Sequence, residues 1–220
     1  VLGAGVAVLV AAAVAGAAWL VGWSDLMALE AVRVEGATGS LADEVSAAAD
    51  APVGTPLVRI DTDAVGSRVG ALAEIADVSV GRSWPRSLVV TVTPRVAAAA
   101  VPDDGSWWSV DGSGVLFELV DERPEGLPVL SAPVDEDAAV VRAAGVTVLT
   151  GLPPAVGDLV ETVTAESEAD VRLELADGAT VLWGGAQDVE RKAQVLIALI
   201  AQQVADVYDL SAPERPAVRR

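Results

Sequence analysis

The sequence predicts an α+β protein with an N-terminal transmembrane helix, a small β-α-α-β-β domain and a mostly antiparallel β domain with packed helices. Three observations predict this: an uncharged apolar stretch over residues 1–23, two short helical patterns flanked by strands in 28–94, and strand-length runs separated by turn residues in 95–220. Of its 220 residues 52% are hydrophobic and 21% charged, so the chain can fill hydrophobic cores and is not a disordered tail.

The segment 1–23 contains no charged residue and fits a membrane span, which needs about 20 apolar residues. Trp19 and Trp23 fall at one end, where interfacial indoles usually sit. No Lys or Arg precedes Arg33, and a flank without basic residues favours the outside of the cell, so we expect a cytoplasmic N-terminus and an extracytoplasmic remainder. The alternative is a cleaved signal peptide ending near Ala15-Gly16-Ala17, but the segment is longer than a usual signal core.

Residues 28–94 are compact enough to form a domain of their own. Ser40 is predicted to cap the first helix, and Asp61 or Thr62 the second. Trp84-Pro85 is interpreted as a structural corner whose indole packs on the domain, with partner binding as the less favoured alternative. The expected order is a strand in Ala28–Gly36, a helix from Ser40, a short apolar run Leu57–Ile60, a helix carrying Val65, Val69 and Leu72, a strand from Ile75, and a strand Ser87–Val92.

Residues 95–220 alternate short strands with turn signals. Asp111–Gly114 and Asp177-Gly178 are predicted hairpin turns, since their glycines can adopt positive φ. Asp135–Leu149 is a helix, or a helix followed by a strand. Asp188 is predicted to cap an amphipathic helix over 188–203, with a buried stripe of Val189, Ala193, Leu196, Ile197 and Ile200. The expected strands are Trp107–Val110, Val115–Leu119, Leu159–Ala165, Val171–Leu175, Thr180–Trp183, Val207–Leu210 and Ala217–Arg219.

The composition excludes several classes of function. Cysteine and histidine are both absent, which excludes disulfides, thiol nucleophiles, Cys/His zinc sites and histidine acid–base relays. The net charge of −18 makes nucleic acid an improbable partner. Asp111–Gly114 offers too few carboxylates for a calcium loop, so we expect no metal and no cofactor. Carboxylate pairs exist, yet the acidic runs read as solvated surface, and the chain is not expected to be an enzyme.

Four segments together resemble the FtsQ/DivIB family of bacterial cell-division proteins. Each is weak alone, but their order behind an apolar anchor is specific; the departure is at Thr93–Ala97, where the family more often has an acidic-basic entry to the second domain. The segments are Val32–Gly36, similar to the first strand of a POTRA domain, Arg82–Val92 with its Trp-Pro turn, Trp108–Phe117 with a W-x-x-D-x-x-G-x-x-F pattern, and Leu127–Leu130. The resemblance implies a transmembrane anchor over 1–23, a POTRA domain over 28–94 and a C-terminal β domain over 95–220.

The resemblance also implies a function: a bitopic scaffold at the division septum in the cell membrane. Family members bind the coiled-coil partners FtsB and FtsL through the C-terminal strand region of the β domain. Here that region would include Tyr208, Asp209, Leu210, Ser211 and Arg215. The POTRA domain would contribute to recruitment through its last strand, near Val90 and Val92.

The residues themselves favour the same C-terminal region. Asp206–Ser211 is short, comes last in the sequence and carries the only tyrosine, so it is the expected sheet edge, where main-chain groups can pair with an incoming strand. Tyr208 suits either a contact or a core position, and the sequence leaves both open. Pro213 and Pro216 limit pairing after Leu210, so an augmenting strand is short or resumes at Ala217.

Three other classes of function are less favoured by the residues. They are an accessory of a polypeptide export system that also carries a POTRA domain, a wall-active enzyme and an anchored sensor.

Trp107 and Trp108, adjacent in a strand, point to opposite faces, so one can be core and the other an exposed candidate contact.

Overall fold

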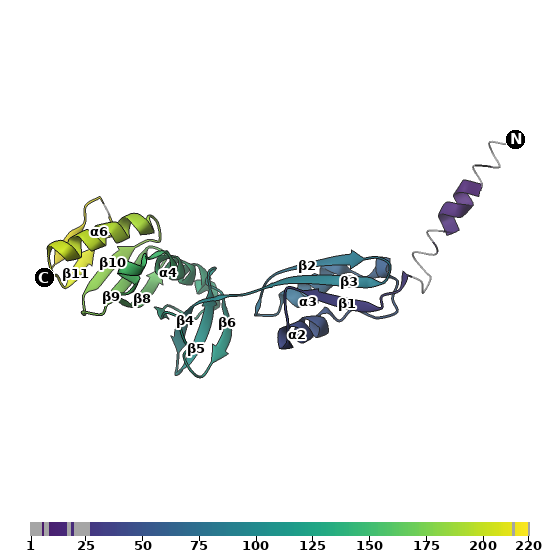
Figure 1. Ribbon diagram of the computed structural model, residues 1–220, viewed down its shortest axis with the longest axis horizontal. Coiled ribbons are helices and arrows are strands. Elements are labelled where there is room, and N and C mark those ends of the chain that lie inside the picture. Colours follow the sequence, from purple (N-terminus) through teal and green to yellow (C-terminus); the bar gives the residue numbers. More distant parts are fainter. Residues whose placement is uncertain (1–5, 7–8, 17–18, 20–26, 213, 220) are drawn as a thin grey trace. The chain divides into compact units, whose positions relative to one another are not determined.

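The computed structural model describes residues 6, 9–16, 19, 27–212 and 214–219 (Figure 1). The chain divides into two compact units, Val1–Arg95 and Val96–Arg220. Among the described residues, no helix is long and apolar enough to cross a membrane. Much of the predicted span over 1–23 lies outside the described residues, and the members of it that are described are helical.

Unit 1 has the predicted β-α-α-β-β order. Its three-stranded sheet has the order β1-β3-β2, with β1 parallel and β2 antiparallel to the central strand β3. The elements are β1 (Ala31–Glu35), α2 (Ser40–Ala49), the 3-10 turn η2 (Leu57–Arg59), α3 (Thr62–Gly70), β2 (Ile75–Ser83) and β3 (Ser87–Pro94). The two helices bury Val45 and Val69 against Leu88 of β3, which gives this unit a hydrophobic core of its own.

The two helices of unit 1 begin in different ways. Asp61 caps α3 as predicted, because its side chain accepts from the backbone N–H groups of Asp63 (3.1 Å) and Ala64 (3.0 Å). The predicted cap at Ser40 is wrong. Ser40 is already the first residue of α2, and Gly39 before it has no side chain with which to cap.

Unit 2 contains two sheets. Its larger sheet has six strands in the order β12-β11-β10-β9-β8-β7, and the smaller has the order β4-β5-β6. The strands are β4 (Ala97–Asp103), β5 (Ser106–Asp111), β6 (Leu116–Val120), β7 (Leu130–Ser131), β8 (Val160–Ser167), β9 (Asp170–Leu175), β10 (Thr180–Gly184), β11 (Val207–Asp209) and β12 (Ala217–Arg219). Pairing is mostly antiparallel, as predicted, with parallel pairs at β7–β8 and β10–β11.

The helices of unit 2 resolve one open alternative and correct two predictions, the cap at Asp188 and the burial of Ile197. The segment after Asp135 is helical throughout, as the 3-10 turn η3 (Glu136–Ala138) and α4 (Ala139–Gly151), followed by α5 (Pro154–Gly157). Asp188 precedes α6 (Val189–Gln202) but makes no capping hydrogen bond, because its backbone is left-handed (φ 56°) instead of extended. In the predicted stripe of α6, Leu196 is buried, whereas Ile197 is 41% exposed.

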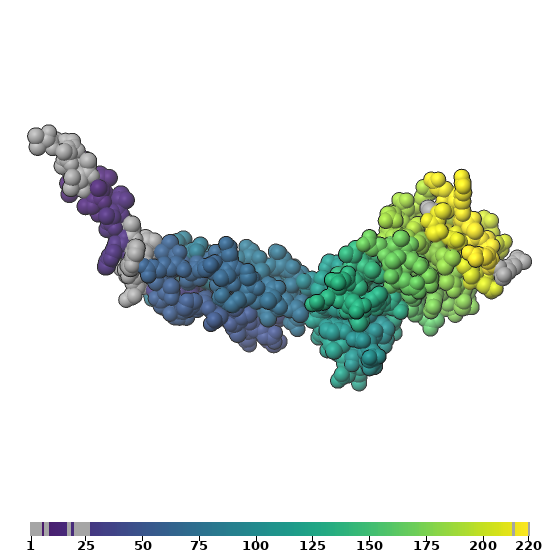
Figure 2. Space-filling view, turned by 180° about the vertical axis from the view of Figure 1, so that it is seen from behind, coloured from purple at the N-terminus to yellow at the C-terminus, as the bar shows by residue number. Residues whose placement is uncertain are grey.

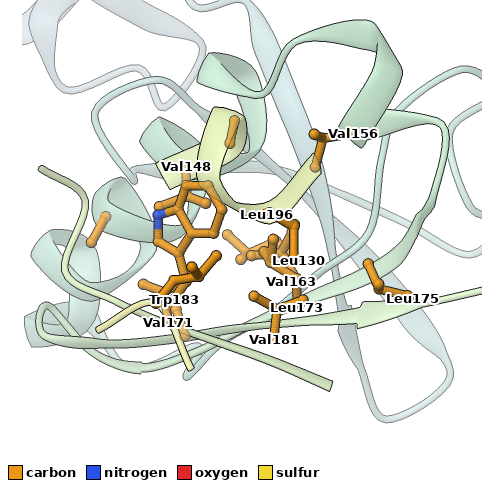
Figure 3. Close-up of a cluster of buried hydrophobic side chains, with 14 of the residues drawn as sticks. Leu130, Val148, Val156, Val163, Val171, Leu173, Leu175, Val181, Trp183 and Leu196 are labelled. Atoms are coloured by element: carbon orange, nitrogen blue, oxygen red, sulfur yellow. The ribbon is translucent and has the colours of Figure 1, made fainter. Parts of the chain in front are cut away.

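Trp183 of β10 is the largest fully buried side chain of the described residues (Figure 3). It stands between the sheet residues near Val171 and the helix residue Val148, and α6 covers it. Lys192 of α6, also buried, donates from Nζ to the carbonyl oxygens of Trp183 (2.9 Å) and Gly185 (2.8 Å). Its ammonium lies 5.7 Å from the Trp183 ring centroid, so one side chain fastens helix to sheet by hydrogen bonds and a cation–π contact.

Arg142 of α4 makes a second fastening of the same kind. Its Nε donates to the carbonyl oxygen of Gly114 (2.7 Å), and its Nη1 to those of Pro133 (2.7 Å) and Asp135 (2.8 Å). Gly114 has φ +82°, and a Cβ there would overlap the carbonyl oxygen of Ala139. The β5–β6 hairpin can therefore approach α4 only because position 114 has no side chain.

Gly114→Ala is expected to destabilise the protein by at least about 2 kcal/mol, because a methyl group would meet backbone atoms and sit at positive φ. Gly112→Ala, two residues earlier in the same turn, is the matched control, since nothing lies within 4 Å of its added Cβ. Urea unfolding of both variants measures the difference. Equal stability of the two variants would contradict the packing described here.

The stability of unit 2 is expected to depend on pH through Lys192. Burial lowers the pKa of Lys192 below its ordinary 10.5, with the nearby Asp188 carboxylate opposing the shift. Between the lowered pKa and 10.5, the unfolded chain holds a proton that the folded chain does not, so raising the pH through this window stabilises the fold. Below the window the full desolvation penalty opposes folding.

The measurement is the difference in unfolding free energy between wild type and Lys192→Met, taken at several pH values from about 7 to 10.5. Every group common to both proteins cancels in this difference. We expect the difference to shift in favour of the wild type as the pH rises. A difference that is constant or moves the other way would show that Lys192 is not desolvated in the folded state.

Candidate functional site

The C-terminal end of the six-stranded sheet holds the predicted binding residues. β11 pairs in parallel with β10, through Thr180↔Val207 and Val181↔Tyr208, and β12 pairs antiparallel with β11, through Tyr208↔Val218. The predicted edge over Asp206–Ser211 is therefore wrong, since β12 covers it. Among the described residues, β12 is paired on one side only, so it is the strand at this edge of the sheet.

Tyr208 is a core residue and not an exposed contact. It is 1% exposed, and its hydroxyl donates to the carbonyl oxygen of Gln203 (3.0 Å) and accepts from the N–H of Ala205 (3.2 Å). Leu210 is also fully buried, and its N–H donates to Leu182 of β10 (2.8 Å). These two residues hold β11 on the core, so they fix the base on which β12 lies.

Asp209 and Ser211 form the turn that follows β11. The Asp209 carboxylate accepts from the N–H (3.1 Å) and the hydroxyl (2.7 Å) of Ser211. Gly184 passes close to this turn, where an added Cβ would lie 3.1 Å from the Cα of Ser211. Ser211 is exposed and Asp209 half-buried, so this turn, unlike Tyr208, is accessible from solvent.

Arg215 lines a shallow hollow of about 440 Å³ beside the C-terminal strands. The hollow is shared with Asp188, Arg191, Ala212 and Glu214, and Arg191 forms an ion pair with Glu214 at 3.9 Å. Both partners of that pair are largely exposed, so it contributes little stability. Figure 2 shows the C-terminal residues, in yellow, on the surface of unit 2.

The second predicted surface, at Val90 and Val92, is wrong as an exposed patch. β3 is the central strand of its sheet, and both valine side chains are buried under the helices of unit 1. Thr91 and Thr93 alternate with them and are exposed on the opposite face. The period-two alternation was visible in the sequence, but which face the helices would cover was not.

The tryptophans also differ from expectation. Trp84 is at the β2–β3 corner, as predicted, with a cis peptide bond to Pro85, but its indole is 52% exposed and does not pack into the core. Trp107 and Trp108 are both half-buried. Trp108 donates to Asp103 (3.0 Å), and Trp107 lies under the guanidinium of Arg123, 5.9 Å from its ring centroid.

The predicted turn at Asp111 is confirmed, and it is structural. One carboxylate oxygen of Asp111 accepts from the N–H of Ser113 (2.9 Å), the hydroxyl of Ser113 (2.7 Å) and the N–H of Val115 (3.0 Å). Within the ranges that the structure describes, no cluster of three or more acidic side chains could hold a metal ion. The C-terminal edge, where β12 is paired on one side only among the described residues, is the candidate site for a partner strand.

Sequence reasoning missed two residues that matter for this edge. Val218 of β12 pairs with Tyr208 and is half-buried, and Lys192 fixes α6 on β10. The signal for Lys192 was its uniqueness, since it is the one lysine of the chain and lies on the apolar side of a predicted helix. The signal for β12 was only the short run Ala217–Arg219 after Pro216.

Two family models match the chain. The model described as "POTRA domain, FtsQ-type" matches residues 27–95. The model described as "Cell division protein FtsQ/DivIB, C-terminal" matches residues 99–211, which includes β11 and ends before β12.

Relatives match over most of the chain. The "Cell division protein FtsQ" of Streptomyces bingchenggensis is 38% identical, over 92% of this chain and 80% of its own, and that of Streptomyces collinus 39% identical, over 92% and 81%. That of Mycolicibacterium smegmatis is 35% identical, over 90% of this chain and 59% of its own. The residues that the two family models match correspond to the two units of the structure. The chain belongs to the FtsQ/DivIB family of cell-division proteins, which are not enzymes.

Proposed function

We propose that the protein is a single-pass membrane scaffold of the division septum that binds FtsB/FtsL-like coiled-coil partners at the β12 edge. In this proposal residues 1–23 are the anchor, with the N-terminus in the cytoplasm, and the POTRA domain (28–94) and the C-terminal domain (95–220) are extracytoplasmic. Family membership supports a role in cell division over the export and enzyme alternatives. The observation that carries the binding site is the one-sided pairing of β12 in the described sheet.

The β12 edge is suited to accept a strand because its base is rigid. β11 is held by the two hydrogen bonds of the Tyr208 hydroxyl and by the burial of Leu210. An incoming strand would then pair with backbone groups already in an extended conformation, which reduces the entropic cost of binding. Pro216 before β12 restricts the strand to a short length and limits indiscriminate edge pairing.

Charge supports the same surface. The protein carries −18 overall, yet Arg215 and Arg219 are exposed around β12. Arg191, beside the same hollow, is paired with Glu214 and adds no net charge there. Arg215 and Arg219 attract an acidic segment to this edge, whereas the rest of the acidic protein repels it. We therefore infer that the partner strand is flanked by Asp or Glu side chains.

For the POTRA domain, we propose the exposed face of β3 as a recruitment surface. Thr91 and Thr93 lie on the face that the helices leave uncovered, and they replace Val90 and Val92 in this role. Hydroxyl side chains on a flat strand face can hydrogen-bond a partner without exposing apolar surface.

Charge reversal tests the β12 edge. Arg219→Glu is expected to weaken binding to the extracytoplasmic part of the coiled-coil partner by about tenfold or more at low salt, since it places repulsion beside the docking strand. Isothermal calorimetry on the full chain measures the affinity. Arg33→Glu is the matched control, because Arg33 is an exposed arginine on β1, an edge strand of the other unit. If Arg33→Glu weakens binding and Arg219→Glu does not, the site belongs to the POTRA domain.

Tyr208→Phe separates a core role from a contact role. The variant loses the hydroxyl that bonds Gln203 and Ala205, so we expect a loss of about 1–3 kcal/mol in unfolding free energy. Partner affinity, measured where the variant is folded, should stay within about twofold of wild type, because a buried hydroxyl is not accessible to a partner. Ser211→Ala is the control, because it also removes one hydrogen-bonding hydroxyl, but from the exposed turn instead of the core. An affinity loss in Tyr208→Phe without a stability loss would make Tyr208 a contact residue.

A further inference from the structure

The turn between β2 and β3 lies at the end of unit 1 where the chain enters from its N-terminal segment (Figure 1). Arg86 in this turn makes three contacts with the entering chain. Its carbonyl oxygen accepts from the N–H of Glu30 (2.8 Å), its Nε donates to the carbonyl oxygen of Ala28 (3.4 Å), and its Nη1 pairs with the Glu30 carboxylate (3.3 Å). The turn is therefore held directly beside Ala28.

The connection from the proposed anchor to this end is short. Trp23 closes the uncharged segment, and Ala28 follows five residues later. Five extended residues reach at most about 18 Å. If residues 1–23 span the membrane, the end of unit 1 that carries Ala28 and Arg86 must lie close to the membrane surface.

This same end exposes apolar side chains. Trp84 is 52% exposed at the tip of the turn. Val53 is 71% exposed in a loop tied to the entering chain, where Leu29 donates to Thr55 (2.8 Å) and accepts from Gly54 (2.9 Å). An exposed apolar residue alone is unremarkable in a folded protein, but these two lie beside the entry point of the anchor.

Basic side chains accompany the exposed apolar ones. Arg82 and Arg86 are both exposed. Arg86 shares its charge with Glu30, whereas Arg82 donates to the uncharged carbonyl oxygens of Leu57 (3.0 Å) and Ile60 (2.6 Å) and so keeps its positive charge. Indoles and arginines are the side chains that favour the headgroup region of a bilayer. The rest of this acidic protein would be repelled by anionic lipid.

We propose that this end of unit 1 rests on the lipid headgroups of the outer leaflet of the cell membrane. We call it the hairpin end and define it by Val53, Trp84 and Arg86. The inference depends on the membrane anchor of the proposed function and adds a second point of attachment to it. Two attachments fix the tilt and height of the POTRA domain, so that the uncovered face of β3 stays at a constant distance from the membrane.

The chain has no cysteine, so a single introduced cysteine can carry a spin label at a chosen site. The labelled full chain is reconstituted in phosphatidylcholine vesicles, with and without phosphatidylglycerol. Collision with oxygen, which concentrates in lipid, is compared with collision with a water-soluble nickel chelate. The labelled positions are Val53→Cys at the hairpin end, Ala73→Cys before β2, and Val10→Cys in the proposed anchor.

Ala73 is the matched site because it is exposed in the same unit but precedes the nine residues of β2, a separation of roughly 30 Å from the turn. We expect the label at 53 to favour oxygen over nickel relative to the label at 73, more strongly with phosphatidylglycerol. Trp84→Ser should abolish this difference. Leu119→Ser, which removes a side chain of matching 51% exposure from unit 2, should leave it unchanged.

The outcomes separate the two proposals. Equal aqueous exposure at 53 and 73, with lipid exposure at 10, would overturn the hairpin-end proposal and leave the anchor intact. Aqueous exposure at 10 would overturn the anchor and this inference with it. Protection of position 53 from both oxygen and nickel would show contact with protein instead of lipid, and would also overturn the inference.

Discussion

The fastening of α6 to β10 by Lys192 is the interaction on which the C-terminal half of the structure depends. The ammonium is buried, and it is stabilised by two carbonyl oxygens at the end of β10 and by the face of Trp183. β11 pairs with β10, and β12 pairs with β11, so the strand that Lys192 contacts is also the one from which the C-terminal edge of the sheet is built outward. The Trp183 indole N–H has no partner among the described residues, which indicates that the bulk of the ring, and not its polar group, is what the core requires.

In both units, basic side chains join two elements by donating to backbone carbonyl oxygens. Arg68 of α3 donates to the carbonyl oxygens at the end of α2, Arg82 of β2 holds the turn η2, and Arg142 of α4 holds the β5–β6 hairpin. Basic residues are scarce in this chain, and several are used on backbone carbonyls and not on acidic side chains. A carbonyl partner is fixed by the backbone, so such a contact holds two elements in one register. Most acidic side chains of the described residues lie at the surface, and Asp111 is the buried exception.

The proposed scaffold role needs buried, well-packed elements next to exposed ones, and both units combine them. In unit 2 the buried Tyr208 supports a strand whose outer neighbour is β12, which is short and exposed. In unit 1 the helices cover one face of β3 and leave Thr91 and Thr93 on the other. The arrangement agrees with the absence of histidine and cysteine, since binding by backbone pairing and surface charge needs no reactive side chain.

The sequence by itself determined the local features: the cap at Asp61, the turn at Asp111, the Asp177-Gly178 hairpin and the β-α-α-β-β order. Each depends on hydrogen bonds or hydrophobic spacing within a few residues, which a single sequence displays. Only the tertiary structure decided that Tyr208 is buried, that β12 forms the edge and that Val90 faces the core. It also decided that the alanine-rich run Ala97–Asp103 is a strand, because Ala99 and Val101 are buried although alanine disfavours strands. These outcomes depend on which distant strands pair and which sheet face the helices cover, and no neighbouring residue encodes that choice.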